Sequence, residues 1–206
     1  MLPAAREELR LQGIPIHGQY KARIREAYSL PSLQQYEQKR FDWYHDEQTM
    51  IDWTTFRQTI RKFHTQKATI HKHVFHFSPT GHWAHQNNHH LPSSCPRCGN
   101  PNENNAHVLQ CTDPVVHQWR QQIFPALKKA IQQSRVQCSD PQLVEIMQAG
   151  IHSYLSHSAP PNPFAYPKPY QTLVSQQNAI GWAHVWMGQF STEWKIQADA
   201  YYRNNP

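Results

Sequence analysis

Four side chains whose chemistry suits metal binding lie close together in the middle of the sequence. The motif C-x2-C-x8-H-x3-C is formed by Cys95, Cys98, His107 and Cys111. Thiolate sulfur and imidazole nitrogen are the ligands of structural Zn²⁺ sites, and a Cys-x2-Cys pair followed by a second ligand pair is typical of them. The spacing predicts that these residues bind one zinc ion.

Two short local structures must hold these ligands. The first two cysteines flank a tight turn, and Gly99, which follows it, can take the positive φ that folds the backbone back. His107 and Cys111 are four residues apart, which places them on one face of a short helix. Asn104 or Asn105 is expected to cap that helix.

The predicted zinc site has the composition of a structural site rather than a catalytic one. A catalytic zinc keeps an open position for water and usually has a carboxylate base nearby. Here four protein ligands, three of them thiolates, close the coordination shell, and Glu103 is the only nearby carboxylate that could act as a base. Because zinc binding contributes about 10–16 kcal/mol to the folding of small zinc domains, chelation is expected to unfold residues 80–120.

Two alternatives to zinc remain for the cysteines. They could be reduced thiols with accidental spacing, or they could form disulfides, which require an oxidising compartment. The stretch Leu2–Glu8 has no apolar signal-peptide region, and no run of eighteen apolar residues occurs, so we expect an intracellular protein, nuclear or cytoplasmic, that is not secreted and has no membrane partner. The remaining cysteine, Cys138, is interpreted as a passive thiol.

The positive charge of the chain is concentrated just before and within the motif. The net charge is −1 over residues 1–52, +6 over 53–102 and +1 over 103–206, and the middle segment contains no Asp or Glu. A segment whose charges are all positive favours binding to a polyanion, above all nucleic acid. The candidate phosphate contacts are Arg57, Arg61, Lys62, Lys67, Lys72 and Arg97. Trp83 is a candidate for stacking on an unpaired base, and the alternative is a solvated basic surface without a partner.

Histidines are also concentrated in this segment, which holds eight of the fifteen. Residues 82–90 are interpreted as a polar, histidine-rich loop. His89 or His90 could substitute for a zinc ligand or shield the site, although exposed histidines without a role are the more common case.

The sequence pattern of the first fifty residues indicates short helices separated by breaks. Helical stretches are expected over 3–11, 17–28 and 33–40, with interruptions at Gly13–Pro15 and Ser29–Ser32. Because none of these pieces has the pattern of a complete domain, residues 1–50 are interpreted as the end of a larger module.

Residues 51–157 predict a helical domain that contains the knuckle, which we define as residues 95–111. Asp52 is expected to cap a helix with apolar positions at helical spacing, and Ser78–Gly81 to end it. Asp113-Pro114 and Asp140-Pro141 predict two further helix starts. The first of these helices is expected to be kinked or divided at Pro125, and to bury Val115, Val116, Trp119, Ile123, Leu127 and Ile131.

The C-terminal part predicts a proline-rich linker over 158–169 and helices over 170–203. The linker is expected to be extended and to lack regular hydrogen bonding. A long aromatic helical segment begins near Tyr170, and Ser191 is the expected cap of a final helix. The fold class is therefore mainly α.

The motif and its flanks resemble the zinc-binding domain found C-terminal to the polymerase in non-LTR retroelement reverse transcriptases. The resemblance spans roughly residues 50–203, with the knuckle as its specific element. The matching stretches are Cys95-Pro-Arg-Cys98-Gly, His107-Val-Leu-Gln-Cys111, Ile51-Asp52-Trp53, Pro79-Thr80-Gly81, Trp119-Arg120, Ile180-Gly181-Trp182 and Gly188-x-x-Ser191-x-Glu193-Trp194. The resemblance implies zinc binding and assistance to nucleic-acid contact, and it assigns that role to the four ligands alone.

The catalytic parts of such enzymes are missing. Polymerases of this kind hold two metal ions with adjacent aspartates, whereas the sequence contains no Asp-Asp pair and no carboxylate cluster typical of a nuclease. We therefore expect a non-catalytic remnant of a reverse transcriptase that binds RNA or DNA, and that could also contact the missing polymerase domain. The alternative is a structural or protein-interaction helical domain in which zinc only pins a loop.

Overall fold

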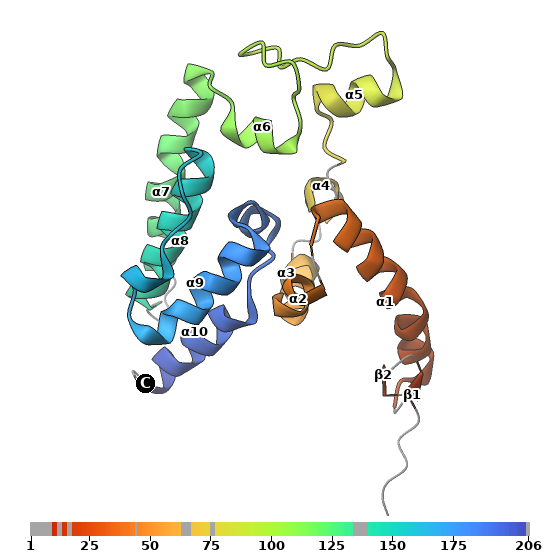
Figure 1. The fold of residues 1–206 in the computed structure, drawn as a ribbon, viewed down its shortest axis with the longest axis vertical. Coiled ribbons are helices and arrows are strands. Elements are labelled where there is room, and N and C mark those ends of the chain that lie inside the picture. Colours follow the sequence, from red (N-terminus) through yellow and green to blue (C-terminus); the bar gives the residue numbers. More distant parts are fainter. Residues whose placement is uncertain are drawn as a thin grey trace, which may run out of the picture. The chain divides into compact units, whose positions relative to one another are not determined.

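The chain forms two compact units, Met1–Thr49 and Met50–Pro206 (Figure 1). The computed structural model describes residues 10–11, 14–15, 18–43, 45–62, 67–74, 77–133 and 140–204. These residues contain ten α-helices, two short 3₁₀ helices and one two-stranded sheet. The predicted mainly α fold is therefore confirmed. Within the same ranges, no helix combines the length and the apolar character that a membrane span requires.

The described residues of the first unit begin with a short hairpin and a long helix. Strands β1 (Arg10–Leu11) and β2 (Ile14–Pro15) pair antiparallel, and α1 runs from Tyr20 to Phe41. The predicted interruption at Ser29–Ser32 is wrong, because α1 continues through it. A proline removes one backbone hydrogen bond of a helix, and the turns on either side keep theirs. Most of the helix predicted over 3–11 lies outside the described residues.

The end of α1 packs against the next helix through a buried polar pair. Asp42 adopts a left-handed conformation and ends α1, and α2 (His45–Met50) follows. Gln48 Nε2 donates to Glu37 Oε2 over 3.2 Å, and both side chains are buried. Burial raises the pKa of the Glu37 carboxyl. This hydrogen bond compensates part of the desolvation of the carboxyl.

The second unit begins with α3 (Trp53–Lys62) and α4 (Lys67–Val74). The predicted Asp52 cap is confirmed, since its carboxylate accepts from both the backbone N–H (2.9 Å) and the hydroxyl (2.6 Å) of Thr55. The backbone N–H of Asp52 donates to the carbonyl of Phe190 over 2.9 Å. The start of α3 is thus attached to the C-terminal part of the chain.

The apolar core of this unit lies among three C-terminal helices, α8 (Pro141–Leu155), α9 (Lys168–Ile180) and α10 (Thr192–Asn204), and the 3₁₀ helix η2 (Trp182–Met187). Asp140 caps α8 as predicted, accepting from the N–H of Gln142 over 2.9 Å. The buried core residues are Leu143, Ile146, Ile151, Leu155, Leu173, Val174, Trp182, Val185 and Trp194. Residues that precede and residues that follow the proline-rich segment in the sequence therefore share one core.

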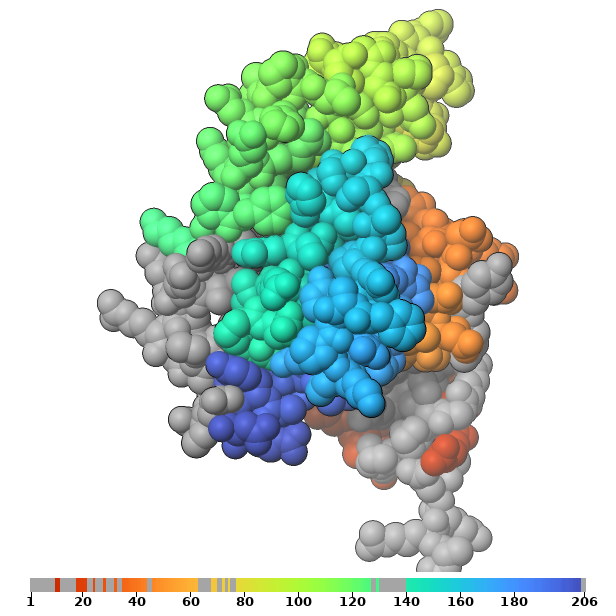
Figure 2. Space-filling view, turned by 60° about the vertical axis from the view of Figure 1, so that its left-hand side comes forward, coloured from red at the N-terminus to blue at the C-terminus, as the bar shows by residue number. Residues whose placement is uncertain are grey.

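The proline-rich segment is not the extended connector that the sequence predicts. It contains a 3₁₀ turn, η1 (Pro163–Ala165), and Asn162 Oδ1 accepts from the N–H of Phe164 over 3.0 Å. Asn178 of α9 donates to the carbonyl of Pro161 over 2.9 Å. In Figure 2 this segment and α9 form one continuous surface with α8. The contacts with α9 supply hydrogen bonds that composition alone does not reveal.

The predicted long helix beyond Tyr170 is interrupted. Helix α9 ends where Gly181 takes a φ of 99°, and η2 follows. Ser191 precedes α10 as predicted, but its hydroxyl is buried without a partner among the described residues. Its backbone N–H instead donates to Gln177 Oε1 over 3.1 Å.

Helix α7 (Pro114–Gln133) begins at the predicted Asp113-Pro114 signal and continues through Pro125, so of the two predicted alternatives, a kink or a division, the division does not occur. The predicted buried stripe is also partly wrong, because Val115 is 59% and Trp119 45% exposed. The middle of α7 contacts the core, where Ile123 and Phe124 pack partly buried. The side chains of Leu127 and Ile131 lie outside the described set.

Candidate metal centre

A short helix precedes the knuckle where the sequence predicts a histidine-rich loop. Helix α5 spans Gly81–Asn87. Thr80 Oγ1 accepts from the N–H of Trp83 over 3.3 Å, and Glu103 Oε2 accepts from the N–H of Gly81 over 2.7 Å. The sequence predicts only a helix end at residues 78–81, but Thr80 also begins α5. The Thr80 hydroxyl and the Glu103 carboxylate accept from N–H groups in the first turn of α5, which have no partner within the helix.

Glu103 connects α5 to the knuckle through its backbone as well as its side chain. Its N–H donates to the carbonyl of Ser93 over 2.8 Å, and its carbonyl accepts from the N–H of His82 over 3.1 Å. A Cβ at Gly81 would lie 2.9 Å from the carbonyl oxygen of Ser93, so only glycine fits there without a shift. Sequence reasoning missed this role of Glu103, since its partners are ten to twenty-two residues away.

The turn that carries the first two cysteines has the predicted geometry. Gly99 has a φ of 77°, and its N–H donates to the carbonyl of Cys95 over 3.0 Å. The N–H of Cys95 in turn donates to the carbonyl of Asn100 over 2.8 Å. These two bonds hold the Cys95 and Cys98 side chains on one side of the turn.

The second ligand pair is carried by α6 (Asn105–Gln110) and the residue that follows it. Of the two predicted caps, Asn104 is the one observed, with Oδ1 accepting from the N–H of His107 over 2.8 Å. Two side chains attach α6 to the helices beyond it. Gln110 Nε2 donates to the carbonyl of Tyr154 (2.8 Å), and Arg120 Nη1 to that of Leu109 (2.9 Å).

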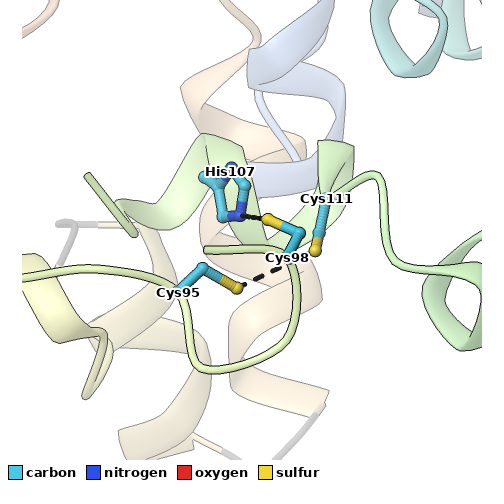
Figure 3. Close-up of side chains that lie close together, drawn as sticks. All are labelled: Cys95, Cys98, His107 and Cys111. Carbon is cyan, nitrogen blue, oxygen red and sulfur yellow. Dashed lines mark hydrogen bonds between the residues drawn. The ribbon is translucent and has the colours of Figure 1, made fainter. Parts of the chain in front are cut away.

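The four predicted ligands converge on one point (Figure 3). Their ligand atoms all lie within 4.8 Å of one another, and this Cys3His group could hold a metal ion. The Sγ atoms of Cys95 and Cys111 are 3.8 Å apart, and Cys98 Sγ lies 3.3 Å from His107 Nε2. Cys95 and Cys111 are buried, whereas the other two ligands are partly exposed. Histidines 89 and 90 are not part of this group.

The local environment shifts the pKa values of Cys98 and Cys111 in opposite directions. A backbone hydrogen bond from Asn100 lowers the pKa of Cys98 to about 6. Burial raises the pKa of Cys111 to about 11. Metal ions bind thiolates and displace the thiol protons, so metal binding at this group should depend on pH.

The predicted nucleic-acid contacts lie on the helices α3, α4 and α5 and on the knuckle turn. Arg57, Arg61 and Lys62 are exposed on α3, and Lys72 is exposed on α4. The side chain of Lys67 lies outside the described set. Trp83 on α5 is 38% exposed.

Arg97 belongs to the knuckle turn itself. Its Nη1 lies 3.9 Å from Asp113 Oδ1, which also accepts from the N–H of Val115 over 2.9 Å at the start of α7. Arg97 is mostly exposed, and exposed pairs of this length contribute about 0–1 kcal/mol. This contact leaves the charge of Arg97 accessible to another anion. Cys138 lies outside the described residues.

Comparison with protein-family models, curated proteins and solved structures found no match to this chain. The resemblance to a retroelement zinc-binding domain therefore depends on the residues of the knuckle and its flanks.

Proposed function

We propose that this chain is a zinc-dependent nucleic-acid-binding module without catalytic activity of its own, derived from a retroelement reverse transcriptase. The observation that carries the proposal is the closed Cys3His group next to a basic segment that contains no acidic residue over 53–102. In this proposal the metal holds the knuckle together, and the basic segment contacts the polyanion.

The ligand set and its geometry support zinc. Zn–S bonds of about 2.3 Å at a tetrahedral centre place two sulfurs roughly 3.8 Å apart. The Sγ atoms of Cys95 and Cys111 have a separation of 3.8 Å. Three thiolates and one imidazole select zinc over the hard cations Mg²⁺ and Ca²⁺, which prefer oxygen.

The same ligand set argues for a structural role. Four protein ligands leave no position for a reactive water, and thiolates reduce the Lewis acidity of the metal. The carboxylate of Glu103, the candidate base, accepts a 2.7 Å hydrogen bond from Gly81 N–H and so helps to start α5. This bond gives Glu103 a structural role that requires no catalysis.

Exposed cations on α3 and α4 support contact with phosphates. Arg61 and Lys62 are both exposed in the last turn of α3. Phosphate contacts release counterions, so binding that depends on them weakens as salt rises. Trp83 lies on α5 within the same acid-free segment and offers a partly exposed ring for stacking.

A salt series tests this function. The zinc-loaded chain is titrated with fluorescent single-stranded RNA and DNA at increasing salt, and the slope of log affinity against log salt is measured. Each lost phosphate contact should make the slope shallower by about 0.7, so Arg61→Ala/Lys62→Ala should reduce it by roughly 1.4. Lys129→Ala/Lys168→Ala is the matched control, because it removes two exposed charges outside the basic segment and should leave the slope unchanged.

A second function is favoured by one observation. The first half of α7 exposes Val115 and Trp119, which is the kind of surface that a protein partner covers. In that case zinc would only stabilise the segment between α5 and α7, without a role in nucleic-acid binding. Absence of nucleic-acid binding at low salt, with the zinc site intact, would overturn the first function and favour this one.

A further inference from the structure

Three histidines outside the Cys3His group line one open hollow beside the knuckle. His85 lies in α5, and His89 and His90 lie in the turn that follows it. Apart from these three histidines, the hollow is lined by Leu91, two prolines and two serines. The lining contains no acidic or basic side chain besides the three imidazoles, so their ring nitrogens dominate its chemistry.

A backbone hydrogen bond sets the tautomer of His85. Its Nδ1 lies 2.7 Å from the carbonyl oxygen of Leu91. A carbonyl oxygen can only accept, so Nδ1 carries the proton, and in the neutral ring the lone pair is on Nε2. Metal-binding histidines commonly donate their other ring N–H to a backbone carbonyl in this way, which orients the ring and raises its basicity.

The spacing of the first two rings matches that of two imidazoles on one metal ion. The ring centroids of His85 and His89 are 5.2 Å apart, with an angle of 73° between their planes. With Zn–N bonds of about 2.0–2.1 Å, two imidazoles at a tetrahedral centre have centroids roughly 5 Å apart. The separation of the two rings is therefore compatible with two ligands of one ion.

We propose that His85 and His89 form a second, weaker metal site for a divalent transition ion of the kind that imidazole prefers, such as Zn²⁺, Cu²⁺ or Ni²⁺. His90 lines the same hollow but is not needed as a ligand, and water completes the shell. The site differs from the Cys3His group in having no thiolate and in being open to solvent. A metal ion at this site would link the last turn of α5 to the segment that precedes Cys95.

Zinc stoichiometry tests the proposal on the full chain. The protein is dialysed against buffered free zinc from the nanomolar to the micromolar range, and zinc per chain is measured by elemental analysis. We expect one equivalent at nanomolar and a second at micromolar free zinc. In His85→Ala/His89→Ala the second equivalent should be lost while the first is retained, which also shows that the knuckle is folded.

Two further variants separate the proposed ligands from exposed histidines in general. His89→Ala alone leaves the His85–Leu91 bond intact and should weaken the second site at least about tenfold. His117→Ala/His152→Ala removes two exposed histidines that flank a different hollow, on α7 and α8, and should keep both equivalents.

Long-range ¹H–¹⁵N spectra provide an independent readout. With one zinc bound, His85 should be protonated at Nδ1, and the second equivalent should shift its Nε2 resonance. A single equivalent at all zinc concentrations, or a second one that persists in His85→Ala/His89→Ala, would overturn the proposal. Protonation of His85 at Nε2 in the one-zinc form would overturn it as well.

Discussion

Two regions of the second unit are held together in different ways. In the knuckle segment, residues 77–113, the buried described side chains are Thr80, Cys95, Asn105 and Cys111, and α5 buries none. In the C-terminal core, residues 141–204, large apolar side chains from three helices and η2 pack together. The first region contains polar bonds and the Cys3His group that could hold a metal ion, whereas the second depends on apolar burial. A change that removes one kind of support should therefore leave the other region folded.

Removal of zinc should have the largest effect, and this effect should be confined to the knuckle segment and the adjoining residues up to 120. Loss of about 10–16 kcal/mol of metal-binding energy is expected to unfold residues 80–120, because few apolar contacts remain there. Hydrogen exchange with and without a strong chelator measures this region by region. Residues 141–204 serve as the internal control and should keep their protection. Unchanged exchange over 80–120 would contradict the division into two regions.

Loss of a buried amide should affect only the C-terminal core. Gln177 is fully buried, and its Oε1 accepts from Trp194 Nε1 (3.0 Å) and Ser191 N–H (3.1 Å). Gln177→Leu leaves two buried donors without a partner, at a cost of about 1–3 kcal/mol each. Urea unfolding followed by tryptophan fluorescence measures the loss, and zinc content should stay at the wild-type value.

The neighbouring glutamine offers a matched control for this substitution. Gln176 Oε1 is buried without a partner among the described residues. Gln176→Leu therefore removes a desolvated atom and should leave stability unchanged or slightly raised. An equal loss in both variants would show that the hydrogen bonds of Gln177 do not stabilise the core.

The same Gly→Ala change should act differently in the two regions. A Cβ at Gly150 would overlap the ring of Trp182, and overpacking of this kind costs about 1–3 kcal/mol, so Gly150→Ala should lower the melting temperature of the core. Gly99 has open space around it but a φ of 77°. Gly99→Ala should cost about 1–2 kcal/mol of left-handed strain and appear as weaker zinc binding. A core melting temperature lowered by Gly99→Ala would contradict this assignment.

The smallest effect is expected from the helix cap in the knuckle. Asn104→Ala removes the acceptor of the His107 N–H, and such caps contribute about 1 kcal/mol. Zinc affinity, measured by competition with a chromogenic chelator, should fall by up to about tenfold. Asn102→Ala is the control, because the bond of Asn102 to Asn100 uses its backbone N–H. Equal affinities in the two variants would show that the cap does not position His107.

Local sequence patterns were sufficient to predict the Cys3His group and the residues at which several helices begin. Each of these features depends on residues a few positions apart: the pairs Cys95/Cys98 and His107/Cys111, the positive φ of Gly99, and the caps at Asp52, Asp113 and Asp140. A capping bond joins a side chain to an N–H two or three residues later. Such interactions are present in the sequence pattern itself, so they could be predicted without the fold.

Features that depend on distant partners were missed. Helix α5 starts with the help of Glu103, twenty-two residues beyond Gly81. The segment around η1 is held by Asn178, seventeen residues from Pro161. The exposure of Val115 and Trp119 was missed because periodicity identifies an apolar face but not whether a neighbour covers it.

By itself, the sequence determined the ligand set, the local turn and cap that present it, and the placement of charge along the chain. Only the tertiary structure decided which side chains are covered and which distant groups satisfy buried donors, as Gln177 does for Trp194. The physical reason is the range of the interactions. Capping and turn formation act within a few residues, whereas burial and long-range hydrogen bonds exist only after separate helices have packed.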